Sequence, residues 1–244
     1  MKKIITNIVI IICSLTLLYS LFSIITWFIE NKKSDSTKSY VIEKAKIKEE
    51  KLKEKYPYIT TDFNSLVSEN NNVRGWIKVP NTSINYPVLQ YSDNSYYLTH
   101  NFNHEYTTSG WIFLDYRNND DEDKNTIIYA HNRLDGSMFG TLKNTLDEKW
   151  HKENKYIYFN TLSSSNTYEV FSVYTIDASD FVSLTNFDSS EVYVSYLKRI
   201  KDSSSISLDV SVNTDDKIIT LYTCSDSDKA RTILHAKLVQ KIEK

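Results

Sequence analysis

The sequence predicts a mainly β domain with helices, folded as a closed or nearly closed mixed barrel. Short runs rich in Ile, Val, Thr and Tyr recur through the second half of the 244 residues, with polar turns between them. One helical pattern stands late among these runs, from Asp188 to Lys201. The chain shows no internal repeat, so nothing points to a repeat architecture.

The composition narrows the class of protein. The formal net charge is −2, with Lys, Glu and Asp mixed along the chain, so no nucleic-acid partner is expected. The length suits one domain of ordinary size with additional segments. There are 18 tyrosines but only 4 glycines and 3 prolines, so the chain is not of low complexity.

The amino terminus is predicted to cross a membrane once. The stretch from Ile4 to Ile29 is apolar and carries no charge, and at about 1.5 Å per residue it spans a hydrocarbon core of roughly 30 Å. It lacks an A-x-A-like cleavage site, which favours an uncleaved signal anchor. Trp27 and Phe28 fit the aromatic belt at its outer edge. We expect residues 1–3 in the cytoplasm, residues 4–29 in the membrane and the globular domain outside the cell.

Residues 30–61 are predicted to form a charged helical stalk. Lys38 to Lys55 is rich in Lys and Glu, with Glu49 and Lys53 as an i,i+4 pair, and Pro57 ends the helix. The globular domain is expected to cover residues 62–244. It begins with a short helix capped by Asp62.

Apolar and β-branched runs predict the strands of this domain. They are Val73–Pro80, Ile84–Gln90, Gly110–Asp115, Asn125–His131, a hairpin of Tyr156–Phe159 with Tyr168–Ile176, and finally Ile218–Cys224 and Thr232–Val239. A helical turn is expected near Asp93–His100, and a short helix or turn at Met138–Leu142.

A thiol and a guanidinium stand at adjoining strand ends. Cys224 ends one run, and Arg231 opens the next after a polar turn of six residues. Two strands joined by so short a loop hold these residues close together, and the positive charge favours the nucleophilic thiolate. Cys13 lies in the apolar amino-terminal segment, so a disulfide with Cys224 is not expected. Cys224 is therefore a candidate nucleophile, with an inert buried thiol as the alternative.

A cysteine nucleophile normally works with a histidine that moves protons. His131 ends an apolar strand, as Cys224 does, and is the candidate. Surface or core packing is expected for the other four histidines, which are His100, His104, His151 and His235. The acidic run at 120–123 is expected to be a solvated loop, so neither a metal nor another cofactor is predicted.

Thr220-Leu-Tyr-Thr-Cys224 resembles the TLxTC signature of sortases, the membrane-anchored transpeptidases of Gram-positive bacteria. The helix before the cysteine strand and three further segments resemble class B sortases. These segments are Asn85–Gln90, Phe113–Asn118, and Thr126–Asn132 with Met138-Phe139. The resemblance covers roughly residues 70–239. It implies a closed barrel of about eight strands, amino-terminal helices and one helix before the cysteine strand.

The resemblance also implies the chemistry. Cys224 attacks the carbonyl after the Thr of a sorting motif near the carboxyl end of a surface protein, and a thioester forms. His131 acts as general acid and then as general base. Arg231 holds the motif and stabilises the oxyanion. An amine of the lipid-linked peptidoglycan precursor then resolves the thioester and attaches the protein to the wall.

A substrate groove beside the cysteine strand is implied as well. Asn85, Leu89 and Tyr129 match family positions that contact the motif or support the oxyanion site. Thr223 is placed to donate a hydrogen bond, unless it is simply a strand residue.

This sequence departs from the family pattern at three places. Tyr222 stands where class B enzymes often carry Ser, and it shares a face with Cys224 on an alternating strand, so its ring is expected to narrow the groove. The interval from Cys224 to Arg231 is short, which affects the shape of the loop. Ala130 precedes His131 where Gly is common.

Three alternative functions are compatible with these residues. A cysteine protease or amidase would form the same thioester and release it to water. A pilus-assembling sortase would use a pilin lysine as the acceptor, and a non-catalytic surface module would use none of this chemistry. For Arg231 alone, the alternative to a catalytic role is a surface ion pair with Asp226 or Asp228.

Overall fold

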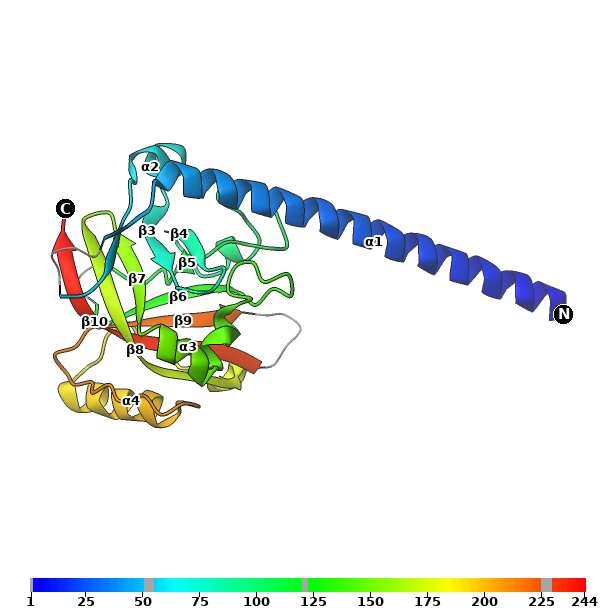
Figure 1. Ribbon diagram of the computed structural model, residues 1–244. Helices are drawn as coiled ribbons and strands as arrows, with labels where there is room; N and C mark the ends of the chain where they lie inside the picture. Colours follow the sequence, from blue (N-terminus) through cyan, green and yellow to red (C-terminus); the bar gives the residue numbers. More distant parts are fainter. Residues whose placement is uncertain (1, 51–54, 120–122, 225–229) are drawn as a thin grey trace.

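The computed structural model describes residues 2–50, 55–119, 123–224 and 230–244. A compact barrel carries one long helix that extends well beyond it, with the amino terminus at its far end (Figure 1). Eight strands close the barrel in the order β10-β8-β7-β3-β4-β5-β6-β9. The closed mixed barrel predicted from the sequence is therefore confirmed.

Most neighbouring barrel strands run antiparallel, but β4 with β5 and β6 with β9 run parallel. The parallel pair β6 and β9 is joined by a long crossover that includes β7, β8 and α4. The barrel strands are β3 (Val73–Lys78), β4 (Asn85–Leu89), β5 (Phe113–Leu114), β6 (Asn125–His131), β7 (Tyr156–Thr161), β8 (Ser164–Asp177), β9 (Ile218–Cys224) and β10 (Ala230–Glu243).

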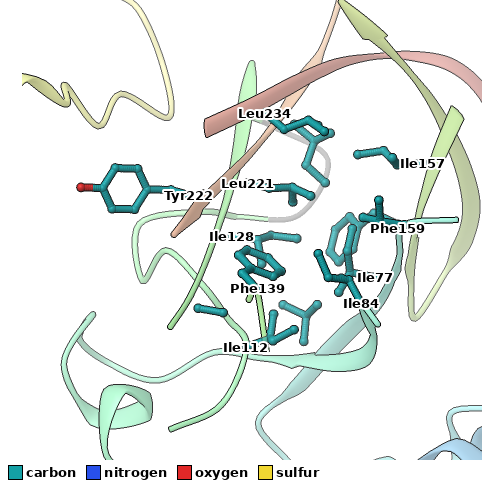
Figure 2. Close-up of a cluster of buried hydrophobic side chains, with 14 of the residues drawn as sticks. Ile77, Ile84, Ile112, Ile128, Phe139, Ile157, Phe159, Leu221, Tyr222 and Leu234 are labelled. Atoms are coloured by element: carbon teal, nitrogen blue, oxygen red, sulfur yellow. The ribbon is translucent and has the colours of Figure 1, made fainter. Parts of the chain in front are cut away.

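Side chains of the barrel strands point alternately into the barrel and away from it, and the inward ones fill its interior. In Figure 2, Leu221 points into the cluster of buried side chains, whereas Tyr222 points away from it. Successive strand residues face opposite sides of a sheet, so the odd and even positions of β9 have different surroundings. The interior is packed with aliphatic and aromatic groups, among them Ile77, Ile84, Ile112, Ile128, Phe139, Ile157, Phe159 and Leu234.

A second apolar layer covers the outside of the barrel under helix α4 (Ser190–Asp202). The Ser189 side chain caps this helix by accepting a hydrogen bond from the backbone N–H of Val192. Tyr193, Tyr196, Leu197 and Ile200 form its buried face. The predicted helix at 188–201 is thus present, and its apolar stripe explains why it packs on the sheet.

The stalk prediction is wrong in its details. One continuous helix, α1 (Lys2–Ala45), runs from the apolar segment onto the domain, and Lys46 then takes a positive φ of 45°. Strand β1 (Lys48–Glu50) follows and pairs with β2 (Tyr58–Thr60). The Lys- and Glu-rich composition favours a helix, but sheet pairing overrides this weak preference. Lys53, the partner assigned to Glu49, lies outside the described residues.

The remaining helices are short. The predicted short helix is present as α2 (Asn64–Glu69), but its N-cap residue is Phe63, which makes no side-chain cap; Asp62, one residue earlier, accepts a hydrogen bond from Asn64 N. The run Met138–Leu142 is a turn, followed by the 3-10 helix η2 (Leu142–Leu146) and by α3 (Glu148–Glu153), which was not predicted. The predicted strand at 110–115 is reduced to β5. Two further 3-10 turns are η1 (Tyr96–Leu98) and η3 (Ala178–Asp180).

Candidate active site

Three neighbouring strands bring the predicted catalytic residues to one end of the barrel. In the parallel register of β6 with β9, His131 is the partner of Cys224. In the antiparallel register of β9 with β10, Tyr222 is the partner of Ile233. The paired residues end there, and Thr232 N donates to the Thr223 side chain, so Cys224 and Arg231 stand just beyond this pairing at the same end of the two strands. Directly opposed side chains on adjacent strands start about 5 Å apart, so the His131 imidazole starts beside Cys224, and Arg231 stands at the start of the strand on the other side of β9.

All three side chains are half-buried. Because alternate residues of a strand share a face, Cys224 and Tyr222 lie on the outer face of the barrel. Thr223 faces the opposite way and is buried. Its hydroxyl accepts a hydrogen bond of 2.8 Å from the backbone N–H of Thr232, which ties β9 to β10 beside the site.

His131 is held from two sides. Its Nε2 lies 2.8 Å from the carbonyl oxygen of Leu98. Since a carbonyl only accepts, Nε2 carries the proton, and Nδ1 is the nitrogen left to gain or lose one. The backbone carbonyl of His131 accepts from Phe139 N at 3.0 Å, and Asn132 N donates to the Cys224 carbonyl at 2.8 Å.

An aromatic cluster lies beside the thiol. Tyr222 stacks on Phe181 with ring centroids 4.1 Å apart, and it meets Tyr129 edge to face at 5.7 Å. Burial raises the pKa of the Tyr222 phenol and the nearby Cys224 adds to the rise, whereas the charge of Arg231 and its hydrogen bond to the phenol oppose it. The Tyr222 hydroxyl is therefore neutral at physiological pH and lies next to both groups.

Tyr129 is fixed in turn by a buried carboxylate. Its hydroxyl donates to Asp115 at 2.9 Å and lies 2.8 Å from the Ser183 hydroxyl. Burial alone would raise the pKa of Asp115, but hydrogen bonds from the side chain and backbone of Arg117 and from Tyr129 outweigh it and hold the pKa at about 2. Asp115 is thus ionised and anchors this side of the site.

The other predicted substrate residues occupy different places. Leu89 is fully buried, and it connects to the site through the register Leu89–Phe113–Tyr129 across β4, β5 and β6. Asn85 accepts a hydrogen bond of 2.8 Å from the indole N–H of Trp76. The structure thus brings Tyr129 and Tyr222 together with the three strand-end residues. The other three predicted substrate residues make contacts inside the domain. Leu89 is buried in the core, and hydrogen bonds tie Asn85 to Trp76 and Thr223 to Thr232.

Several residues at the site were not predicted. Leu98 acts through its backbone carbonyl, and no side-chain pattern signals such a role. Phe181 lies in the connection between β8 and α4, where Val182, Leu184 and Phe187 follow it, and no pattern distinguishes it from them. Asp115 and Arg117 belong to the Phe113–Asn118 segment that carried part of the resemblance, so their spacing was the available signal.

The described residues contain no group of three or more His, Cys, Asp or Glu side chains arranged to hold a metal ion. Neither Cys13 nor Cys224 forms a disulfide in the described part of the chain. The acidic residues 120–122 and the connection 225–229, with the pairing suggested for Asp226 or Asp228, lie outside the described residues.

Comparisons with known proteins agree on one family. A model of the sortase domain matches residues 77–239. Sortase B of Listeria monocytogenes is 37% identical over 187 residues, covering 75% of this chain and 76% of that protein. Sortase B of Staphylococcus aureus is 31% identical over 244 residues, covering 98% of each chain.

Solved structures give the same result in three dimensions. Sortase B from Bacillus anthracis in complex with AAEK1 superposes with a TM-score of 0.77 at 35% identity, covering 87% of this chain and 99% of that chain. A Staphylococcus aureus sortase B–substrate complex superposes with a TM-score of 0.70 at 36% identity, covering 73% of this chain and 84% of that chain. With fold and sequence in agreement, the chain belongs to the sortase family, in its class B, and is a cysteine transpeptidase of the cell-wall sorting type.

Proposed function

We propose that this protein is a membrane-anchored transpeptidase that cleaves a carboxyl-terminal sorting motif of surface proteins through a thioester on Cys224. The acyl group then passes to an amine of a lipid-linked peptidoglycan precursor. One observation carries the proposal, namely the pairing of His131 with Cys224 across β6 and β9, with Arg231 at the same end of the adjacent strand β10.

The first half-reaction forms the thioester. The Cys224 thiolate attacks the carbonyl carbon of the scissile peptide bond, and the carbonyl electrons move onto oxygen. Collapse of this oxyanion breaks the C–N bond, and the imidazolium of His131 gives its Nδ1 proton to the leaving amine. The hydrogen bond of Nε2 to Leu98 supports this assignment, because it keeps the ring oriented throughout the proton transfer.

The second half-reaction reverses the proton flow. His131, now neutral, takes a proton from the incoming amine as that amine attacks the thioester carbonyl. The C–S bond breaks, a new amide forms, and the Cys224 thiolate returns. Because the same imidazole serves as acid and then as base, its loss blocks both steps.

Arg231 faces the nucleophile on the side opposite His131. Its charge favours the thiolate before attack and the oxyanion after it, and a single good donor to an oxyanion is worth roughly 3 kcal/mol. Tyr222 and Tyr129 line the outer face beside the thiol, so we assign them to substrate contact. Asn85, Leu89 and Thr223 are assigned to shaping the groove from behind.

The domain boundaries and the membrane topology form part of the proposal. By length and composition α1 meets the requirement for a membrane span, and its apolar half projects away from the barrel (Figure 1). We assign residues 1–3 to the cytoplasm, 4–29 to the membrane and 62–244 to an extracellular catalytic domain. The acceptor amine of a wall precursor lies on that outer side.

A peptide assay tests the transpeptidase reading against its rivals. The full chain in detergent micelles is incubated with a sorting-motif peptide, with and without an added amine, and products are separated by mass. A new amide product is expected with the amine, and it should be lost in Cys224→Ala and His131→Ala. Hydrolysis that the amine leaves unchanged would favour a protease, and selective use of a lysine side chain would favour pilus assembly.

The variant Arg231→Lys separates the contribution of the positive charge of Arg231 from that of its planar guanidinium geometry. An ammonium group cannot reproduce the planar fork of a guanidinium, so turnover should fall steeply although the charge is kept. Near-normal turnover by this variant would remove Arg231 from the mechanism.

A further inference from the structure

The half of α1 nearest the barrel is built into the catalytic domain. Its partly or fully buried positions follow a largely helical spacing, at Glu30, Asn31, Ser34, Thr37, Lys38, Val41, Ile42, Lys44 and Ala45. Such a spacing places one stripe of the helix against the barrel for about four turns. In Figure 1 this part of α1 lies over the barrel on the side of β3 and β4.

The first contact of this stripe reaches the turn that follows His131. Asn31 accepts a hydrogen bond of 2.6 Å from an Nη2–H of Arg133. The Arg133 side chain is only 12% exposed, and it also pairs with Asp135 in the same turn. A charged donor so well shielded from water makes a stronger hydrogen bond than a surface pair.

A second contact, two helical turns further along α1, supports the same turn indirectly through Ser83 and Tyr86. Lys38 donates to the carbonyl of Ser83 at 2.7 Å, and its ammonium lies 4.3 Å from the centre of the Tyr86 ring. The Tyr86 hydroxyl accepts from the backbone N–H of Met138. The Ser83 hydroxyl donates to the carbonyl of Gly136.

This turn requires such support. Met138 holds a positive φ of 51° although it is buried and not a glycine, a conformation that costs free energy and persists only where neighbours enforce it. Gly140 leaves no room for a Cβ, which would lie 2.1 Å from the Arg133 carbonyl oxygen. The turn folds back on the catalytic strand, because Phe139 N donates to the His131 carbonyl and Asn132 bridges to Met138.

The same helix also reaches the other support of His131. Leu98, whose carbonyl binds Nε2, opens a loop that returns to α1. There Thr108 donates to Glu30 at 2.5 Å, and Lys33 pairs with Glu105 at 2.9 Å. The Lys33 pair is largely exposed and contributes little by itself.

From these contacts we infer that the docked half of α1 sets the position of the His131 imidazole, with Asn31 and Arg133 as positioning residues. The inference rests on the proposed role of His131 as the acid and base. Since α1 is one unbroken helix, the element assigned to the membrane is also the element that orders the proton-transfer group.

The test uses the full chain in detergent micelles. Asn31→Leu removes the acceptor for Arg133, whereas Asn31→Asp keeps an oxygen there. Tyr40→Phe is the matched control, because Tyr40 joins α1 to Glu69 of α2, away from the turn after His131. The imidazole signal of His131 is followed by NMR with ¹³C-labelled histidine and assigned by its loss in His131→Gln.

Asn31→Leu should move the His131 signal, shift the pH dependence of turnover and lower kcat about ten- to a hundredfold, the effect of one lost hydrogen bond to a charged group, with KM little changed. Asn31→Asp should restore both the signal and turnover, and Tyr40→Phe should match the original protein. An Asn31→Leu protein that behaves like Tyr40→Phe in signal and in pH profile would overturn the inference. Full turnover by His131→Gln would instead overturn the proposed function, and the NMR signals would then decide the positioning by themselves.

Discussion

His235 should make this protein lose stability in mild acid. The ring is fully buried under α4, where Nε2 lies 3.1 Å from the Tyr174 hydroxyl and Nδ1 lies 2.9 Å from the Thr220 hydroxyl. Burial, helped by the positive charge of Arg199, lowers the pKa of His235 to about 3. The native state therefore keeps this imidazole neutral, and the predicted role in core packing is confirmed.

The size and sign of the effect follow from proton linkage. Above pH 6.5 the ring is neutral in both the native and the unfolded states, so it contributes no pH dependence. Below that value the unfolded chain binds a proton that the native state refuses, and the free energy of unfolding falls. At pH 5 the loss is about 2 kcal/mol, and it approaches about 5 kcal/mol near pH 3.

Urea unfolding of the full chain in detergent, followed by tryptophan fluorescence at several pH values from 8 to 4, measures this loss. His235→Gln lowers stability at pH 8 because a packed ring is gone, but its curve should be flatter, by about 2 kcal/mol between pH 8 and pH 5. His104→Gln, which changes an exposed histidine, is the control. Parallel curves for His235→Gln and the original protein would refute the reasoning.

Three further changes test the supports of the site and of the fold. Gly140→Ala forces a methyl group against the Arg133 carbonyl, so stability should fall by about 1–3 kcal/mol in thermal unfolding and turnover should fall with it; an unchanged Tm would contradict the packing. Asp115→Asn removes the charge that Arg117 binds and should cost about 2 kcal/mol in urea unfolding at pH 7, a difference that narrows toward pH 2 as the carboxylate is protonated. Ser189→Ala removes the cap of α4 and should cost about 1 kcal/mol, whereas Ser189→Asp should keep most of the stability.

The local sequence pattern was sufficient to predict proximity for residues on strands that follow each other directly along the chain. Cys224 and Arg231 stand at the ends of consecutive β runs, and a short connection makes antiparallel neighbours of such runs. Their proximity was therefore predictable from residues alone. His131 reaches Cys224 through a parallel pairing of β6 with β9, which are separated by the long crossover. Spacing does not encode that pairing. Its place at a strand end distinguished His131 among the five histidines, and the resemblance to sortases then supplied its role.

The sequence was least informative where distant contacts decide the structure. The Lys- and Glu-rich segment after Ala45 has helical composition, yet it forms β1 because β2 offers an edge to pair with. The support of His131 by Leu98 is a backbone contact, to which any residue at that position could contribute. The docking stripe of α1 mixes Glu, Asn, Ser, Thr and Lys with Val, Ile and Ala, so only its end near Ala45 carries an apolar signal of burial.

The alternation of β9 explains how this site can differ from its relatives without a change of fold. Leu221 and Thr223 face inward, where Leu221 packs the core and the Thr223 hydroxyl binds β10, so neither can vary freely. Tyr222 faces outward, and its large ring is matched by Phe181 stacked upon it and Tyr129 set edge-on. A serine at position 222 would leave those two rings without their common partner. Tyr222 is therefore one of three packed aromatic rings, with Phe181 and Tyr129. Substrate preference at this site should depend on the three rings together.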